Sequence, residues 1–255
     1  MIGFVVPTMG TREANLTVCI QSLKENDVSN ICVVAPAYAV DDIAAKHPEV
    51  RIVVDSRRGL AAAINDGIRT FPRQVRYVNW LGDDDRLLGG SMAELQRALE
   101  DDSDSVLAHG MCEYVNSKGD KLFLNRSAKW SERLMRFGPQ LVSQPAVLFA
   151  RESFDRVGGL DESLSFAFDL DLFLKLRGVG RFVRVPITAA RYCWHEEALT
   201  VASRRSSVIE ASKVRMKHVP RKLRWLVRVW EYLIRSLIFV AGRILSTFAK
   251  YKSKP

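Results

Sequence analysis

The stretch YVNWLGDDDRL, residues 77 to 87, joins an apolar run directly to a run of acidic residues. The apolar part ends at Gly82, a pattern typical of a buried strand in a parallel sheet. Three aspartates, Asp83, Asp84 and Asp85, follow without interruption. Because ligands of open α/β sheets bind beyond the carboxyl ends of the strands, we expect these carboxylates to face a cleft.

The acidic run has two interpretations. Adjacent carboxylates in a partly dehydrated cleft repel one another unless a cation neutralises them, and Mg²⁺ and Mn²⁺ prefer oxygen ligands of this kind. A metal ion that holds a phosphate would meet this requirement. Alternatively, the run is a solvated turn before a helix over residues 91 to 100, whose N-terminal end favours nearby aspartates. The short Asp-x-Asp pattern leaves both interpretations open.

The positive charge of the chain is concentrated at its C-terminal end. The net charge is +9, and from residue 220 onward there are nine Lys or Arg residues and one Glu, a balance of +8. Residues 1 to 219 hold the other 29 basic and 28 acidic residues. The globular part is therefore nearly neutral, which argues against a nucleic-acid partner and indicates a partner of the tail.

Length, composition and cysteine content bound the class of protein. With 255 residues, of which 47% are hydrophobic, the chain suits one α/β catalytic domain, residues 1 to 219, and a tail, residues 220 to 255. Four scattered cysteines without a C-x-x-C spacing argue against a zinc site and a disulfide framework, and suit the reducing cytosol. The start, MIGFVVPTMG, has neither a basic leader nor a long apolar run, so we expect a cytoplasmic location.

Strand and helix patterns alternate through the first half of the chain, as doubly wound folds require. A hairpin pattern over residues 112 to 124 then interrupts the alternation. We therefore predict an α/β fold with a single Rossmann-like mixed sheet flanked by helices, plus C-terminal amphipathic helices. The predicted strands cover residues 3 to 6, 31 to 35, 51 to 54, 77 to 81, 105 to 109 and 146 to 149, and the predicted helices cover residues 13 to 24, 41 to 46, 57 to 68 and 91 to 100.

The segment from residue 143 to 177 predicts a mostly buried helix that opens on two aspartates, Asp169 and Asp171. Leucines and a phenylalanine fill most of its other positions. An aspartate at a helix N-terminus is commonly a cap. Two in an apolar setting also fit catalysis, because burial gives a carboxylate the raised pKa of a general base.

Five motifs follow one another between residues 3 and 200: VVPTMGTREANLTVCIQSL, GLAAAINDGI, WLGDDD, QPAVLFARESFDRVGGLDESL and FDLDLFLKLR. In this order and spacing they resemble the family-two inverting glycosyltransferases of the GT-A fold, of the bacterial rhamnosyl- and cell-envelope-type. The resemblance implies transfer of a sugar from a nucleotide-diphosphate sugar to an acceptor hydroxyl, with inversion at the anomeric carbon.

The resemblance also implies roles for single residues. Asp85, together with Asp83, would hold Mg²⁺ or Mn²⁺ on the donor diphosphate, and Asp84 would line the donor site beside them. Asp169 would be the general base that deprotonates the acceptor. Inverting transfer needs both features, a base opposite the leaving group and a positive group on the departing diphosphate.

Further donor contacts follow from the same resemblance. Pro7 and Thr8 would end the first strand beneath the nucleotide, and Asn65, with Gly67 two residues later, would lie near the sugar-phosphate. RYCWHEEALT, residues 191 to 200, resembles the late R-x-x-x-H stretch of the family, so His195 would reach the metal or the diphosphate. A single histidine is also commonly a packed or surface residue.

The sequence departs from the family pattern at the end of the second predicted strand. Most relatives have an aspartate there, and this chain has Ala35 and Pro36. We therefore expect donor binding to depend on Asp55 and on Arg57 or Arg58, whose guanidinium groups suit phosphate oxygens. UDP, dTDP and GDP sugars all remain open.

The tail predicts a basic amphipathic helix with tryptophans on its apolar side. Arg235 and Arg243 interrupt the apolar run, which favours a helix lying in the membrane surface over a spanning one. A helix packed on the catalytic domain or on a second copy in a homo-oligomer is the alternative, and calmodulin-type recognition would need a similar composition. We expect a peripheral protein on the inner face of the plasma membrane, with a lipid-linked or cell-envelope glycan as acceptor.

Two other classes of function remain alternatives. A nucleotidyltransferase would use a similar acidic strand end, but it would carry a Gly-rich basic loop after the first strand, and VPTMGTRE fits that poorly. A non-catalytic membrane adaptor would keep the fold and present the basic tail. The missing aspartate at the second strand favours the adaptor, and the retained Asp85 and Asp169 count against it.

Overall fold

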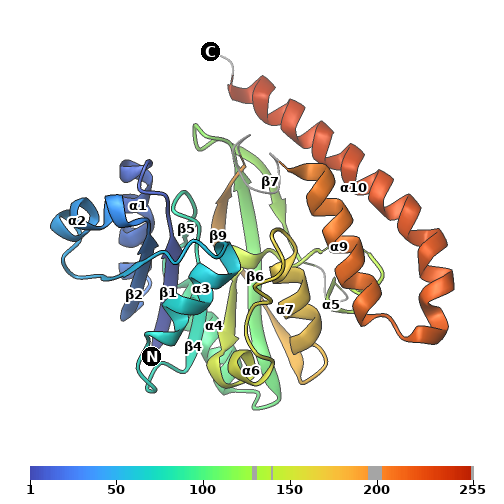
Figure 1. Cartoon of the computed structure of the whole chain (residues 1–255), viewed down its shortest axis with the longest axis horizontal. Helices are drawn as coiled ribbons and strands as arrows, with labels where there is room; N and C mark the ends of the chain where they lie inside the picture. The colour runs from blue at the N-terminus through green and yellow to red at the C-terminus, as the bar shows by residue number, and fades with distance from the viewer. Residues whose placement is uncertain (128–130, 139, 195–202, 254–255) are drawn as a thin grey trace.

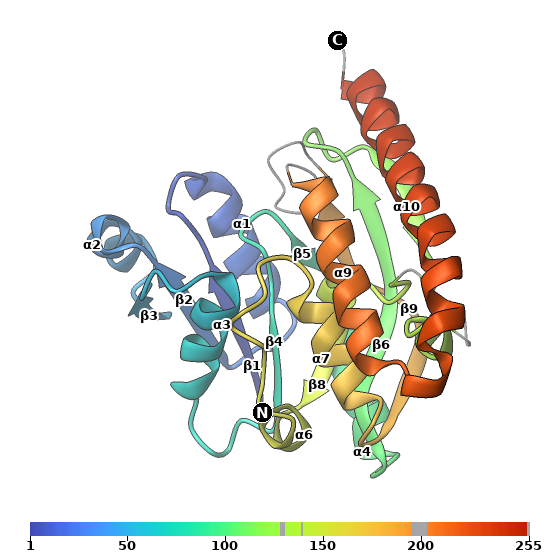
Figure 2. The same ribbon diagram turned by 45° about the vertical axis from the view of Figure 1, so that its right-hand side comes forward.

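The structure is a computed structural model that describes residues 1–127, 131–138, 140–194 and 203–253 (Figure 1). In this part of the chain the strands form one mixed sheet, and helices pack on both of its faces (Figures 1 and 2). The predicted fold class, a Rossmann-like mixed sheet flanked by helices, is confirmed.

Buried β-branched and aromatic residues form the central strands, because such side chains pack well on a sheet that is covered on both faces. The strand order is β3-β2-β1-β4-β8-β6-β9-β5, and β7 pairs with β6. The strands are β1 (Ile2–Pro7), β2 (Asn30–Ala35), β3 (Arg51–Val54), β4 (Tyr77–Trp80), β5 (Arg86–Leu87), β6 (Ser105–Val115), β7 (Lys121–Asn125), β8 (Val147–Ala150) and β9 (Arg181–Cys193).

Most strands of the sheet run in one direction. β1 is parallel to β2 and to β4, whereas β8 is antiparallel to both β4 and β6. β6 and β9 are parallel to each other. The carboxyl ends of β1, β2, β4, β6 and β9 therefore meet at one edge of the sheet, where ligands of open α/β sheets bind.

The helices divide between two apolar cores, one on each face of the sheet. One core takes residues of α3, α6 and α7, and the other takes residues of α1, α2 and α4. The helices are α1 (Glu13–Lys24), α2 (Ala37–Lys46), α3 (Leu60–Arg69), α4 (Ser91–Glu100), α5 (Ser131–Leu134), α6 (Arg151–Arg156), α7 (Phe168–Leu176), α9 (Arg204–His218) and α10 (Arg224–Ser253), with short 3-10 turns η1 (Gln144–Ala146) and η2 (Arg221–Leu223).

Some elements are longer in the structure than the sequence predicted. The strand predicted to end at His109 continues to Val115 and pairs along its length with β9, which the sequence did not predict. β9 contains Pro186 and many half-exposed positions, so it lacks the continuous apolar run of a buried strand. The predicted hairpin is confirmed, because β6 pairs antiparallel with β7 around a turn at Gly119 with φ of 87°.

The C-terminal region forms a hairpin of two helices, α9 and α10, which lies against the face of the sheet that carries α7 (Figure 2). α9 packs on α7, and α10 packs on the outer side of α9 (Figures 1 and 2). In the part of the chain that the structure describes, no helix combines the length and the apolar character that crossing a membrane requires.

Gly67 lets α3 approach β1 closely. A Cβ atom at this position would lie 2.7 Å from Val5 Cγ1 and 3.2 Å from Val34 Cγ2. Both valines are branched, buried strand residues, so neither side chain can move aside easily. Gly67, which the resemblance assigned to the neighbourhood of the sugar-phosphate, thus has a packing role between helix and sheet.

We expect Gly67→Val to lower the free energy of unfolding by about 3 kcal/mol, because the added methyl groups overpack the α3 and β1 contact. Urea denaturation followed by circular dichroism measures the change. Gly89→Val is the matched control, since a Cβ at Gly89 meets nothing within 4 Å. An equal loss of stability in both variants would contradict this explanation.

Candidate active site

Thr8 links the end of β1 to the acidic run that follows β4. Its hydroxyl donates a hydrogen bond to Asp83 Oδ2 at 2.5 Å, and its backbone N–H donates to the Val34 carbonyl at 3.0 Å. Both Thr8 and Asp83 are buried. The structure thus brings together three residues predicted for the donor site, because Pro7 directly precedes Thr8 at the strand end.

Arg12, which was not predicted from the sequence, lies over the same carboxylates. Its Nη2 lies 2.6 Å from Asp83 Oδ1, and its Nη1 lies 2.9 Å from Asp84 Oδ2. The planar guanidinium spans two of the three acidic side chains, a geometry that lysine could not reproduce. It offsets part of the repulsion among the carboxylates.

Asp85 is the last member of the acidic run and contacts the end of β9. Its side chain is buried, and its Oδ1 accepts a hydrogen bond from the Cys193 N–H at 2.9 Å. Burial raises the pKa of Asp85 well above its usual value, and the negative charges of Asp84 and Asp83 raise it further. A bound cation would favour the charged form of this carboxylate.

Asp83 and Asp85 offer the oxygen donors that Mg²⁺ and Mn²⁺ prefer. Their burial and mutual repulsion also fit a site that takes up positive charge. These two residues would hold the ion, whereas His195, the other predicted metal ligand, lies outside the described residues. Within residues 1–127, 131–138, 140–194 and 203–253, no group of three or more His, Cys, Asp or Glu side chains is arranged to hold a metal ion.

Asn65 ties α3 to the loop before α7. Its Nδ2 donates to the Leu160 carbonyl and to Glu162 Oε1, each at 3.0 Å, and its Oδ1 accepts the Leu160 N–H at 3.1 Å. The loop begins at Gly158 and Gly159, whose φ values of 84° and 68° favour glycine. Asn65 is therefore occupied by structural hydrogen bonds in this structure, and its predicted contact with the sugar-phosphate stays a prediction.

The three predicted donor-binding residues after β3 differ in their surroundings. Asp55 Oδ1 accepts the backbone N–H of Arg57 at 2.9 Å, and the Arg57 side chain is exposed. The Arg58 guanidinium instead pairs with Asp66 at 2.8 Å and with Glu162. Arg58 would have to exchange these carboxylates for a phosphate, whereas Arg57 is already exposed to solvent.

Asp169 lies in the first turn of α7, as predicted. Its Oδ1 accepts the Leu170 N–H at 2.7 Å, and its Oδ2 accepts a hydrogen bond from Gln140 Nε2 at 2.8 Å. Burial raises the pKa of the Asp169 carboxyl above its usual value, and hydrogen bonds from Gln140 and the backbone oppose this rise. A carboxylate with a raised pKa is suited to accept a proton.

Contacts between aromatic rings join the start of α7 to the end of β4. The Trp80 ring lies 6.3 Å from the ring of Phe168, which directly precedes Asp169. Gln144 in η1 reinforces the same region, because its Nε2 donates to the Trp80 carbonyl at 2.8 Å. Since Trp80 precedes the acidic run by three positions, Asp169 and the acidic run belong to the same end of the molecule.

Asp171, the second aspartate of α7, faces a different environment. Its side chain is fully buried and meets Lys175 Nζ at 2.7 Å and His218 Nε2 at 2.9 Å. Lys217 Nζ lies 3.6 Å away. Despite the opposing effect of burial, these partners lower the pKa of Asp171 to about 2. Asp171 therefore stays charged and anchors α7 to α9, a structural role.

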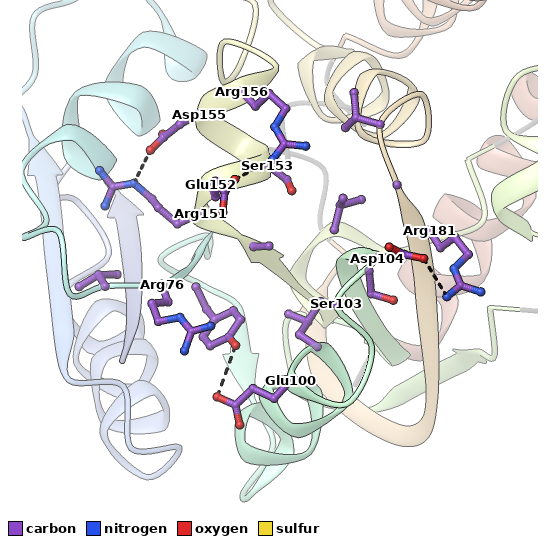
Figure 3. Close-up of a pocket in the computed structure, with 18 of the residues that line it drawn as sticks. Arg76, Glu100, Ser103, Asp104, Arg151, Glu152, Ser153, Asp155, Arg156 and Arg181 are labelled. Atoms are coloured by element: carbon purple, nitrogen blue, oxygen red, sulfur yellow. Dashed lines mark hydrogen bonds and ion pairs between the residues drawn. The ribbon is translucent and has the colours of Figure 1, made fainter.

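A broad hollow of about 1020 Å³ opens at the opposite end of the sheet (Figure 3). Tyr77, Ser105 and Arg181, which begin β4, β6 and β9, line it. The arginines that line it include Arg151 and Arg181, which pair with Asp155 and Asp104. None of its lining residues belongs to the acidic run, so this hollow is separate from the candidate site.

Comparison with known families decides the class of the protein. Residues 4–155, which include most of β1, the acidic run and most of α6, match the family described as Glycosyl transferase family 2. The chain belongs to glycosyl transferase family 2. No curated protein sequence matches this family 2 chain.

Solved structures that resemble this family 2 glycosyltransferase have the GT-A fold. S. aureus TarS 1-349 in complex with UDP-GlcNAc has a TM-score of 0.64 at 13% identity, over 89% of this chain and 70% of that one. The mannosyltransferase PcManGT from Pyrobaculum calidifontis, in complex with GDP-Man and Mn²⁺, has a TM-score of 0.63 at 17% identity, over 98% of this chain and 73% of that one. These similarities establish the fold.

Three polar residues of the site were not predicted from the sequence. Arg12 lies in the loop before α1, Gln140 lies in an irregular segment, and the Cys193 N–H is a backbone group at the end of an unpredicted strand. An arginine six positions after the end of the predicted first strand could have drawn attention to Arg12. Neither Gln140 nor Cys193 carries a local signal, because only the fold brings them to the aspartates.

We expect Asp171→Asn to lower the free energy of unfolding by about 2 kcal/mol at pH 7, because a carboxyl with a depressed pKa stabilises the folded state when charged. The difference from the parent should be complete above pH 4, the region of an unfolded aspartate, and should vanish as the pH falls through about 2.

Urea denaturation at a series of pH values measures this difference. Glu152→Gln is the control, because its pair with Arg156 is exposed and contributes less than about 1 kcal/mol. A difference between Asp171→Asn and the parent that stays constant down to pH 2 would rule out the electrostatic explanation.

Proposed function

We propose that the protein is an inverting glycosyltransferase that moves a hexose from a nucleotide-diphosphate sugar to an acceptor hydroxyl. The observation that carries the proposal is the pairing of two carboxylate sites at one end of the molecule. One is the acidic run after β4, bound to Thr8 and Arg12, and the other is Asp169 in α7. Membership in family 2 and the GT-A fold support it.

Asp169 is the general base in this proposal. Its carboxylate takes the proton of the acceptor hydroxyl while the acceptor oxygen forms a bond to the anomeric carbon. The bond from that carbon to the diphosphate oxygen breaks on the opposite side, so the configuration inverts. Gln140 and the Leu170 N–H hold the carboxylate in one orientation.

Asp83 and Asp85 hold Mg²⁺ or Mn²⁺ in the proposal, with Asp84 beside them in the donor site. The ion supplies positive charge that stabilises the departing diphosphate. The PcManGT complex with Mn²⁺ supports a divalent ion, as does the complex of GalNAc-T7 with UDP, GalNAc and Mn²⁺. Among the donor-binding residues, Pro7 and Thr8 lie at the end of β1, and Asp55 and Arg57 follow the end of β3. Asn65 and Arg58 both bind Glu162.

The acceptor in this proposal is a lipid-linked or cell-envelope glycan, and the protein works on the inner face of the plasma membrane. What supports it is the +8 charge of residues 220–255 beside a nearly neutral catalytic domain, residues 1–219. Nucleotide-sugar donors are cytoplasmic small molecules, so a peripheral enzyme would meet both substrates at the membrane surface.

We expect Asp169→Asn to lower kcat by about 10²- to 10⁴-fold with little change in donor affinity, because the amide cannot accept the proton. Release of nucleoside diphosphate in the presence of acceptor measures kcat, and calorimetric titration measures donor affinity. Asp42→Asn, at an exposed position of α2, is the matched control. An active Asp169→Asn variant would remove the proposed base.

We expect a panel of nucleoside diphosphates and their sugars to give one nucleotide that binds only with Mg²⁺ or Mn²⁺. Asp85→Asn should abolish that binding, because the amide replaces a charged ligand of the ion with a neutral one. Isothermal titration calorimetry with and without a chelator measures both effects. Binding that is equally tight without metal would contradict the role of Asp85, and no binding of any nucleotide would favour the non-catalytic adaptor.

A further inference from the structure

Helix α10 leaves a row of large apolar side chains exposed. We call the five residues the outer row: Trp230, Leu233, Leu237, Val240 and Ile244, whose exposed fractions are 54%, 51%, 67%, 53% and 64%. They recur at intervals of three and four residues, so they share one face of the helix over about four turns. Most exposed apolar residues in proteins are isolated, whereas this row is continuous.

The opposite face of α10 is already occupied. The Arg235 guanidinium donates to the Ser212 hydroxyl of α9, and Trp194 Nε1 donates to Ser246 Oγ at 3.4 Å. Figures 1 and 2 show α10 outside α9, with no element of the described chain over its outer side. The helix cannot turn the outer row inward without losing these contacts.

Charge decides between the candidate occupants of the outer row. A second copy of α10 would bring two tails of +8 together, and like charges oppose such a pairing. An anionic bilayer attracts the same charge, at about 1 kcal/mol for each Lys or Arg near the surface. Arg221, Lys222 and Arg243 are exposed on η2 and α10, where they can meet lipid headgroups.

We propose that the outer row docks α10 flat on an anionic membrane surface, with its apolar side chains below the headgroups. This orientation keeps the contacts with α9, because that helix then lies on the side away from the lipid. Trp194, which α10 contacts, directly follows Cys193, whose N–H binds Asp85. The docked helix therefore keeps its link to the acidic run on the side away from the lipid, and the connection to a lipid-linked acceptor rests on the proposed function.

Vesicle co-sedimentation tests the docking. The full chain should bind vesicles of phosphatidylglycerol and phosphatidylcholine, should bind phosphatidylcholine alone weakly, and should lose binding as salt increases. Leu237→Lys should weaken binding severalfold although it adds a positive charge, because it removes an apolar side chain from the layer below the headgroups. Val179→Lys, an exposed apolar residue outside the tail, is the matched control.

The outcomes separate docking from catalysis. Leu237→Lys should keep the nucleotide affinity of the parent, since the residues that bind the acidic run do not belong to the outer row. Equal vesicle binding by Leu237→Lys and the parent would overturn the proposal. The proposal would also be overturned if the full chain did not bind vesicles and formed a dimer that Leu237→Lys dissociates. The occupant of the outer row would then be a second copy of the chain. A failure of nucleotide binding would bear on the proposed function only.

An independent observation concerns Glu210 of α9. Its Oε1 accepts the backbone N–H groups of Phe166 and Ala167, each at 2.7 Å, and its Oε2 accepts the Ser165 N–H at 3.2 Å. These donors lie directly before α7, where free N–H groups of a helix need acceptors. A carboxylate from another helix therefore holds the backbone turn that leads into the helix carrying Asp169.

We infer that Glu210 is a positioning residue for Asp169, a role that rests on Asp169 being the base. It fixes the start of α7 and adds a negative charge beside the base. Asp169 is also bonded by Gln140 and the Leu170 N–H, and the charged Asp171 on the same helix is paired with Lys175, Lys217 and His218. The charge of Glu210 raises the pKa of Asp169, so its removal should lower that pKa.

Three variants test this role. Glu210→Ala should lower kcat about tenfold or more and speed amide hydrogen exchange at residues 165–167, whereas Glu210→Gln should keep most protection, because its amide oxygen still accepts hydrogen bonds. In Glu210→Gln the acid limb of the pH profile of kcat should move to lower pH, since the charge is gone. Glu152→Gln, the control, should change none of these three readouts.

Unchanged exchange at residues 165–167 in Glu210→Ala would overturn the positioning role, and an unmoved acid limb in Glu210→Gln would overturn the electrostatic part. Hydrogen exchange needs no turnover, so it reports on Glu210 even if Asp169 proves not to be the base.

Discussion

The repulsion among carboxylates at the end of β4 is the constraint on which the rest of the site depends. Three consecutive aspartates begin at the edge of a buried sheet, and two of them are buried. Thr8 and Arg12, from the end of β1 and the start of α1, supply the hydrogen bond and the positive charge that make this burial tolerable. Because β1 and β4 are adjacent parallel strands, their carboxyl ends can share these groups.

The two aspartates of α7 have the same side chain but different surroundings, and their pKa values therefore shift in opposite directions. Burial raises the pKa of Asp169 and the negative Glu210 raises it further, while the hydrogen bonds from Gln140 and the backbone oppose this rise. Asp171 meets a lysine on its own helix and basic residues of α9, so its pKa falls. They stand two positions apart, and their side chains therefore leave the helix in different directions. One is suited to take a proton, and the other stays charged and holds the helix.

Much of the fold was predictable from the sequence because its first half follows simple patterns. Helices α1 and α4 begin and end where the apolar periodicity predicts, and β3 has the predicted bounds. The acidic run and Asp169 stood out as polar residues in apolar settings. By contrast, β9 and α9 were not predicted, since their residues are half-exposed and mixed in polarity and depend on contacts with β6 and α7. Arg12, Gln140 and Glu210 were missed for a related reason, because their partners are distant in sequence.

The dependence of α7 on α9 has a consequence for the order in which the chain can fold. Glu210, which holds the turn before α7, and Lys217 and His218, which neutralise Asp171, are made more than 30 positions after the helix itself. During synthesis the strands β1 to β4 can pair before these groups exist, whereas α7 would still carry a buried charge with few partners. Proteolytic loss of the C-terminal hairpin would therefore damage first the helix that bears the base, although the cut lies far from it in sequence.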